Sequence, residues 1–206
     1  MYLATSSSPA IAAAMTDGSI GRMCSPATGT AREQGAYWAA DNGAFSAKWD
    51  ADKWWAFLVK NSAFATTCLF AALPDVVADW PATLARSLPW AERVRALGYR
   101  AAIVIQDGAS LESMPWDQID AVFIGGTTAW KLGPEVRELV TAAKAHGLIV
   151  HMGRVNSERR LRYAKFIGCD SADGTFLSFG PDVNLPRLQA WLRGVNDQTD
   201  LLSSGN

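Results

Sequence analysis

The sequence predicts an α/β fold, and within that class a compact (β/α)8 barrel, on three observations. Eight short apolar runs recur along the 206 residues, helix-like or helix-sized segments separate them, and polar residues or glycines follow most of the runs. Alternating strands and helices imply a parallel sheet covered by helices. Eight such units favour a closed barrel, for which about 200 residues is the lower size limit. A doubly wound open sheet is the alternative.

The first half of the chain provides four of the expected strands, at Tyr2–Ala4, Gly21–Cys24, Tyr37–Ala40 and Cys68–Leu73. A helix is expected to start at Ser8–Pro9, because serine is a good N-cap and proline suits the first helical turn. A second helix is expected over Asp50–Lys60, where an N-cap aspartate precedes an apolar helical face.

The second half provides the other four strands, at Arg100–Ile105, Ala121–Ile124, Leu148–Met152 and Thr175–Phe179. Its expected helices are Ala82–Leu97, Pro134–His146, Ser157–Ile167 and Leu185–Val195, the first of them closed by Gly98 as a C′ glycine. No linker or low-complexity segment divides the chain. We therefore expect one domain over residues 1–196 and a disordered tail over residues 197–206.

Composition narrows the class of protein. Hydrophobic residues make up 49% and charged residues 19%, which is typical of a globular protein. The net charge of −1 argues against a bulk cationic nucleic-acid binder, so any contact with nucleic acid needs a local basic patch. Three dispersed cysteines and two histidines argue against disulfides and a zinc site. No apolar run is long enough to span a membrane, and the N-terminus is a poor signal peptide. We expect a cytoplasmic protein with neither a metal nor a cofactor.

Polar residues gather where the expected strands end, which is the edge of a barrel that carries chemistry. After strands three to seven stand Asp41-Asn42-Gly43, Pro74-Asp75, Gln106, Gly125-Gly126 and His151-Met152-Gly153-Arg154, and the segment before strand eight holds Asp170 and Asp173. Glycines let a planar ligand approach the backbone. Two carboxylates about 5 Å apart can cleave a glycosidic bond, one as nucleophile and the other as acid or base.

Each of these residues also has a purely structural interpretation. Asp41-Asn42-Gly43, Gly125-Gly126 and Asp173-Gly174 are typical of turns, and Gln106 could be a solvated loop residue. Asp75 or Asp79 could cap a helix, His146 could contact a helix dipole, and His151 could be a core or rim histidine. The basic run that begins with Arg154, Arg159 and Arg160 is either a solvated helix face or a contact to phosphates.

Seven of these segments, taken in order, resemble the tRNA-guanine transglycosylase family. They are DNGAFS at 41–46, LPDVVADWPA at 73–82, RSLPWAERV at 86–94, AIVIQDG at 102–108, FIGGTT at 123–128, VHMGRV at 150–155 and GCDSAD at 168–173. The most similar branch is the short 7-deazaguanine DNA transglycosylases of phages and bacteria. The resemblance implies a TIM barrel that replaces guanine in DNA with a 7-deazaguanine such as preQ0, through a covalent glycosyl-aspartate. A phage-encoded protein of this kind would act in the cytoplasm of the bacterial host.

The resemblance also implies a role for each matched residue. Asp173 corresponds to the nucleophile and Asp41 to the general acid/base, while Asp75 corresponds to the aspartate that reads the base edge, with Asp79 close enough to compete. Gln106 and Gly126 complete the base pocket, to which Gly125, Phe45, Met152 and Gly153 also belong. The base must leave its stack to enter such a pocket.

Departures from the family pattern change the expected substrate. Ala44, Ser46 and Asp107 replace family residues, and the family's C-terminal zinc-binding cysteines, which help to position tRNA, are absent. The expected partners are therefore DNA, a nucleotide or a nucleoside together with a 7-deazaguanine base, with a further protein or a second copy holding the DNA. Two alternatives remain open, an N-glycosidase that uses the same site and a nucleobase-binding module without turnover.

Overall fold

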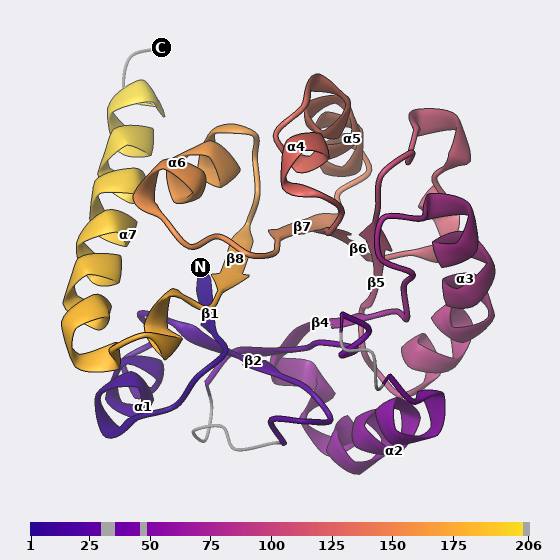
Figure 1. Cartoon of the computed structure of the whole chain (residues 1–206), viewed down its shortest axis with the longest axis horizontal. Helices are drawn as coiled ribbons and strands as arrows, with labels where there is room; N and C mark the ends of the chain where they lie inside the picture. Colours follow the sequence, from indigo (N-terminus) through magenta and orange to yellow (C-terminus); the bar gives the residue numbers. More distant parts are fainter. Residues whose placement is uncertain (30–35, 46–48, 204–206) are drawn as a thin grey trace.

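The chain folds into a closed barrel of eight parallel strands with helices outside it (Figure 1). The computed structural model describes residues 1–29, 36–45 and 49–203, with the backbone alone for the last seven. The strands are β1 (Tyr2–Ala4), β2 (Gly21–Cys24), β3 (Trp38–Ala40), β4 (Cys68–Ala72), β5 (Ala101–Ile105), β6 (Ala121–Ile124), β7 (Ile149–Met152) and β8 (Ser171–Gly174). Because β8 pairs in parallel with β1, the (β/α)8 prediction is confirmed and the open sheet is excluded.

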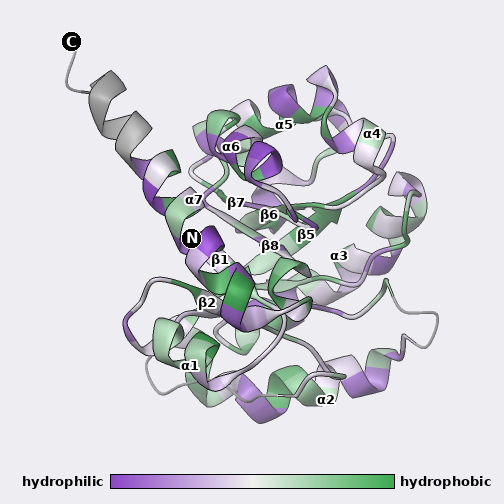
Figure 2. Ribbon diagram, turned by 60° about the vertical axis from the view of Figure 1, so that its left-hand side comes forward, coloured by the Kyte–Doolittle hydropathy of each residue, from purple (hydrophilic) through white to green (hydrophobic). Residues whose placement is uncertain are grey.

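Helices cover the outside of the ring, and several begin at the caps that the sequence predicts. They are α1 (Pro9–Thr16), α2 (Ala51–Asn61), α3 (Trp80–Ala96), α4 (Thr128–Lys131), α5 (Pro134–Ala145), α6 (Glu158–Phe166) and α7 (Pro181–Ser203). Ser8, Asp50 and Ser157 each accept a hydrogen bond from a backbone N–H of the first turn of α1, α2 and α6. The helices carry both hydrophobic and hydrophilic stretches, as expected of elements with one face on a core (Figure 2).

Side chains alternate between the two faces of each strand, which builds two separate cores. A small inner cluster fills the barrel, and six buried residues form it: Leu3, Met23, Ala39, Phe70, Ala102 and Ala121. The outward side chains join the helices in a larger cluster, which includes Trp38, Ile103 and Val150. The inner positions contain three alanines, so the large rings of Phe70 and Phe123 occupy the space that these alanines leave.

The last strand lies earlier in the chain than the sequence predicts. It is Ser171–Gly174, whereas the expected strand Thr175–Phe179 contains a 3-10 helix over Phe176–Ser178. The apolar residues of the later segment suggested a buried strand, but β8 turns its polar side chains inward and therefore has no apolar signature. Asp173-Gly174 is consequently not a turn, since Asp173 pairs with Leu3 inside the sheet.

Two further boundaries differ from expectation. α3 starts at Trp80 because Asp79, rather than a later residue, caps it. α7 continues to Ser203, so residues 197–203 of the expected disordered tail are helical, and residues 204–206 lie outside the described part. Propagating an existing helix costs little compared with starting one, and α7 is already established by its packing on α1 and α6.

No helix in the described part of the chain is long and apolar enough to cross a membrane.

Candidate active site

A cavity of about 330 Å³ opens at the carboxyl ends of the strands. It collects residues from six of the loops and strand ends that the sequence singles out. Nine of the predicted site residues line it: Asp41, Phe45, Asp75, Gln106, Gly125, Gly126, Gly153, Arg154 and Asp173. Because these residues come from distant parts of the chain, only closure of the barrel brings them together.

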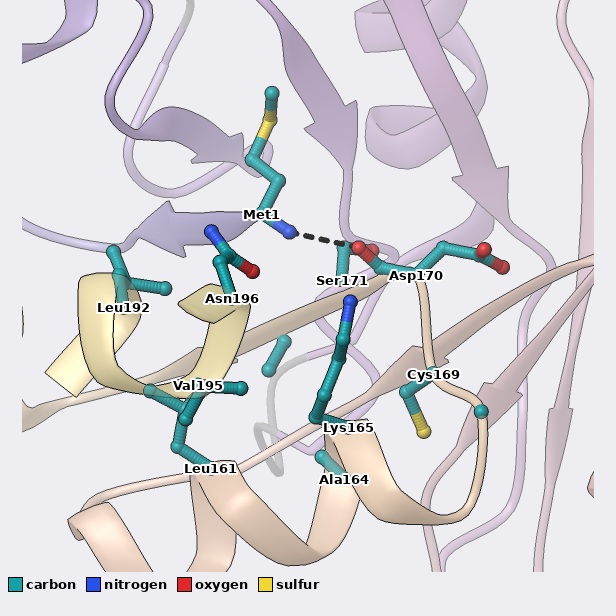
Figure 3. A pocket seen from close by; sticks show the side chains of 12 residues that line it. Met1, Leu161, Ala164, Lys165, Cys169, Asp170, Ser171, Leu192, Val195 and Asn196 are labelled. Carbon is teal, nitrogen blue, oxygen red and sulfur yellow. Dashed lines mark hydrogen bonds between the residues drawn. The ribbon is translucent and has the colours of Figure 1, made fainter. Parts of the chain in front are cut away.

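A second cavity, of about 280 Å³, lies at the opposite end of the barrel (Figure 3). Met1, Lys165, Cys169 and Asp170 are among its lining residues. Asp170, which the sequence places beside Asp173, accepts from Lys144 Nζ at 2.8 Å there. It precedes the first residue of β8, so it sits one strand length away from the carboxyl end, and it does not belong to the site.

Asp173 lines the cavity, and one of its two carboxylate oxygens is held by neighbouring groups. Its Oδ1 accepts the backbone N–H of Arg154 at 2.9 Å and lies 3.6 Å from His151 Nε2. Its Oδ2 receives no hydrogen bond from the described residues, and the side chain is 14% exposed. An oriented carboxylate with one free oxygen is suited to attack an electrophilic carbon.

Asp41 follows β3, and its surroundings favour the protonated acid. Burial raises its pKa to about 6, and the negative charges of Asp173 and Asp75 act in the same direction. Its Oδ1 accepts a long hydrogen bond, 3.3 Å, from the N–H of Gly43. A carboxyl group that titrates near neutrality can give and take a proton at physiological pH.

Asp75 is held in a network of amides that joins three neighbouring loops. Asn42 Nδ2 donates to its Oδ1 at 2.8 Å, and Gln106 Nε2 donates to its Oδ2 at 2.5 Å. Gln106 Oε1 in turn accepts the N–H groups of Gly126 and Ala78, both at 2.9 Å. Burial nevertheless raises the pKa of Asp75, against the effect of these donors.

The structure distinguishes Asp75 from Asp79. Asp79 accepts the N–H of Ala82 at 3.0 Å as the N-cap of α3, whereas Asp75 lines the cavity. Asn42, which the sequence treats only as part of a turn signal, is one of the two residues that fix Asp75. The feature of the sequence that could have pointed to Asn42 is its position directly after Asp41.

The site glycines are required by the protein's own packing. Gly126 has φ of 68°, and a Cβ there would come within 2.5 Å of the Trp130 ring. A Cβ on Gly125 would come within 2.7 Å of Gln106 Nε2, and one on Gly153 within 2.6 Å of the Phe123 ring. These glycines let the loops close tightly around the cavity.

Arg154 joins two loops across the cavity. It adopts φ of 60°, and its guanidinium donates to the carbonyl oxygen of Gly126. The guanidinium also lies 5.6 Å from the centre of the Phe45 ring, which is 74% exposed. Phe45 and Arg154 thus stand together at the mouth, where a flat ligand could stack on them.

Three predicted site residues do not line the cavity. Met152 is buried in the outer core, because its neighbour His151 points into the barrel and alternation turns Met152 towards the helices. Arg159 and Arg160 belong to α6 and line a separate surface hollow. The prediction of Met152 as a base-binding residue is therefore wrong for this geometry.

His151 lies in the barrel directly beside Asp173. Its Nδ1 is 2.8 Å from Ser171 Oγ, and its Nε2 has no hydrogen-bond partner among the described residues. Burial lowers its pKa, although Asp173 opposes this, so a neutral imidazole faces the Asp173 carboxylate. The sequence indicates a core or rim histidine, and the structure places it in the core.

Lys131 is a buried cation that sequence reasoning missed. It is 3% exposed at the end of α4, and its Nζ donates to the carbonyl oxygen of Gly153 at 2.7 Å. Burial lowers its pKa to about 7, and nearby Arg154 adds to the effect. Lys131 therefore anchors the loop at Gly153, and the backbone N–H of the following residue, Arg154, orients Asp173.

No group of three or more His, Cys, Asp or Glu side chains within the described ranges could hold a metal ion.

Comparison with known proteins shows the fold and no family. No family model and no curated protein matches the chain. A tryptophan synthase structure from M. tuberculosis is 16% identical, with a TM-score of 0.54, over 94% of this chain and 88% of that chain. A native KDPGal structure is 13% identical, with a TM-score of 0.52, over 96% and 93%.

A Bacillus subtilis protein with an EAL domain, in complex with c-di-GMP and calcium, is 13% identical with a TM-score of 0.49. The chain covers 47% of that protein's length, and 84% of this chain is aligned. None of these three proteins is described as a transglycosylase. At such identities the likeness to the tryptophan synthase and KDPGal structures shows the TIM barrel alone, a fold that supports many chemistries, so function has to be argued from the site.

Proposed function

We propose that this protein is a base-exchange transglycosylase that replaces guanine in a nucleic acid with a 7-deazaguanine base. The observation that carries the proposal is that two carboxylates in one cavity have opposite surroundings. Asp173 has an oriented carboxylate with a free oxygen, and Asp41 has a pKa of about 6. Pairs of carboxyl groups with divergent environments commonly divide nucleophilic and acid roles between them.

In the proposed reaction Asp173 Oδ2 attacks C1′ of the sugar. The bond between C1′ and N9 of guanine breaks, its electron pair goes to the base, and protonated Asp41 supplies the proton that leaves with it. A glycosyl ester on Asp173 remains. The incoming base then attacks C1′, Asp41 takes its proton, and the ester bond breaks to restore the Asp173 carboxylate.

The amide network supports recognition of a purine edge. Asn42 and Gln106 each donate once to Asp75, which leaves further lone pairs on both carboxylate oxygens for N–H groups of a base. Because Asn42 and Gln106 fix the carboxylate before a ligand arrives, little side-chain entropy is lost on binding. A guanine-like edge, with adjacent N–H donors, is the chemistry that such an acceptor recognises.

The experiment is a label-exchange assay. The protein is incubated with guanine-containing DNA and radiolabelled guanine, then with preQ0, beside Asp173→Asn and Asp170→Asn. We expect wild type and Asp170→Asn to incorporate label, and Asp173→Asn to lose at least about a hundredfold in rate, as expected for removal of a nucleophile. Asp170 is a matched control because its carboxylate lies at the other end of β8.

Three results would overturn the proposal. Full exchange by Asp173→Asn would remove the covalent mechanism. Release of free base without incorporation would identify an N-glycosidase instead. Recovery of unchanged base bound one-to-one, with no turnover of DNA, nucleotide or nucleoside, would identify a binding module.

A further inference from the structure

Beside the active site the surface holds a hollow with three arginines. It has a volume of about 170 Å³, and its lining residues are Leu132, Arg137, Arg159, Arg160 and Tyr163. Arg137 belongs to α5, and Arg159, Arg160 and Tyr163 belong to α6. These two helices lie side by side on the outside of the barrel (Figure 1). No acidic residue lines this hollow.

The charges of these three arginines are not compensated within the described part of the chain. The ion pairs found there use Lys53, Arg95, Lys144, His151 and Arg162 as cations. Glu158, which is adjacent to Arg159, is engaged by Arg162 at 2.7 Å, and Glu138, which is adjacent to Arg137, takes part in none of these ion pairs. Three like charges around one small hollow repel one another, and an anion bound among them would remove that cost.

Neutral partners orient two of the arginines towards the hollow. Arg137 Nε lies 3.4 Å from the Tyr163 hydroxyl, and its guanidinium lies 5.5 Å from the centre of the Tyr163 ring. Arg160 Nη1 donates to the carbonyl oxygen of Arg154 at 3.3 Å. Each bond uses one of the five N–H donors of a guanidinium, so most donors remain available for the oxygens of a tetrahedral anion.

The hollow and the active site share a structural connection. Arg154 lines the active-site cavity, and its backbone N–H orients Asp173, while its backbone carbonyl accepts from Arg160. Leu132 lines the hollow directly after Lys131, whose amine holds Gly153. A substrate whose sugar reaches Asp173 can therefore extend a neighbouring part across Arg154 into the hollow.

We propose that the hollow lined by Arg137, Arg159, Arg160 and Tyr163 binds a backbone phosphate of a polynucleotide whose target base occupies the cavity. The inference rests on the proposed function for the identity of the base, and it adds the place on the surface where the backbone of the strand is held. With a net charge of −1, the chain relies on this local patch for contact with a strand. Guanidinium groups are suited to phosphate because they donate in pairs.

The experiment measures binding of a fluorescein-labelled single-stranded 12-mer DNA with one guanine by anisotropy, over a series of salt concentrations. We compare the double variant Arg137→Gln/Arg159→Gln with Arg187→Gln/Arg193→Gln, which removes two exposed arginines of α7. We expect several-fold weaker binding only in the first variant. Its slope of log affinity against log salt should become shallower by about 0.7 for each phosphate group that is no longer neutralised. Arg160 stays unchanged because it also holds Arg154.

Exchange kinetics separate this inference from the proposed function. The Arg137→Gln/Arg159→Gln variant should raise KM for the 12-mer, leave kcat unchanged, and exchange the free nucleoside as wild type does. Equal binding and equal salt slopes in the two double variants would overturn the phosphate site, even if base exchange is observed. Loss of binding in the first variant alone would support the site, even if no variant exchanges bases.

Discussion

At the scale of single residues, the site depends on how the protein treats three aspartates differently. Asp173 is oriented by a backbone N–H, Asp75 is fixed by two amides, and Asp41 accepts a long hydrogen bond from the N–H of Gly43. The pKa of Asp41 consequently rises to about 6. In the proposed mechanism one residue type thus supplies a nucleophile, a recognition group and a proton carrier, because the surroundings of each aspartate differ.

The raised pKa of Asp41 predicts a pH-dependent cost to stability. Its folded pKa of about 6 exceeds its ordinary value of 3.8, so the folded state retains a proton that the unfolded chain has lost between those values. The stability that the protonated Asp41 carboxyl contributes to the folded state is fully present below about pH 4, and it is lost as the pH rises through about 6. Asp41→Asn should therefore gain up to about 3 kcal/mol over wild type between pH 4 and 7.5, measured by urea unfolding.

The exposed Asp52 on α2 provides the control for this comparison. Asp52→Asn, measured over the same range, reports the effect of removing one exposed carboxylate. A difference for Asp41→Asn that does not grow with pH would show that the pKa of the Asp41 carboxyl is not raised.

Sequence alone predicted the residues of the site better than it predicted their surroundings. Asp41, Asp75 and Gln106 follow apolar runs, so the position at strand ends was enough to find them. Lys131 and Asn42 were missed because their role is to hold other groups, and such a role depends on contacts between loops that are far apart in sequence.

At the scale of elements, the alternation of side chains along β7 decides which residues reach the substrate. His151 points into the barrel, so Met152 must point outward, where it is buried against the helices. The resemblance of VHMGRV to a family motif did not reveal the outward direction of Met152, because such a motif does not determine to which face of the sheet a strand residue points. β8 was missed for a related reason, since its inward residues Ser171 and Asp173 are polar.

Substitution of Met152 tests this orientation. Met152→Leu keeps the volume and should cost less than about 1.5 kcal/mol, whereas Met152→Ala leaves a cavity and should cost about 2–5 kcal/mol. Chemical denaturation measures both values. KM for the incoming base should stay unchanged in Met152→Leu. A changed KM at unchanged stability would place Met152 in the base pocket after all.

At the scale of the whole molecule, the barrel is built around an inner core to which the strands β1 to β7 each contribute an apolar side chain. The alternation of apolar runs and helices was enough to predict eight strands and their parallel closure, because few other arrangements bury such runs. The inner filling was not predictable, since alanines on several strands leave room that aromatic rings from others fill. That complementarity exists only once the ring is closed.

Removing an inner side chain should therefore weaken the entire ring. Leu3 is fully buried in the inner cluster, and Leu3→Ala should lower the free energy of unfolding by about 2–5 kcal/mol. Far-UV circular dichroism and tryptophan fluorescence should report the same midpoint, because no domain boundary separates the strands. Leu111→Ala, at a site that is 40% exposed, should change little. Separate midpoints for the two probes would contradict the expectation that the whole ring of strands unfolds in one step.

The pairing of Leu3 with Asp173 also sets the order in which the molecule can become active. A ribosome makes the first strand early and the eighth strand last, and translation at about 5–20 residues per second separates them by roughly 10 to 30 seconds. During that interval the nascent chain holds Asp41, Asp75 and Gln106 without Asp173. In the proposed mechanism Asp173 is the nucleophile, so the emerging polypeptide would be inactive until the final strand docks beside the first.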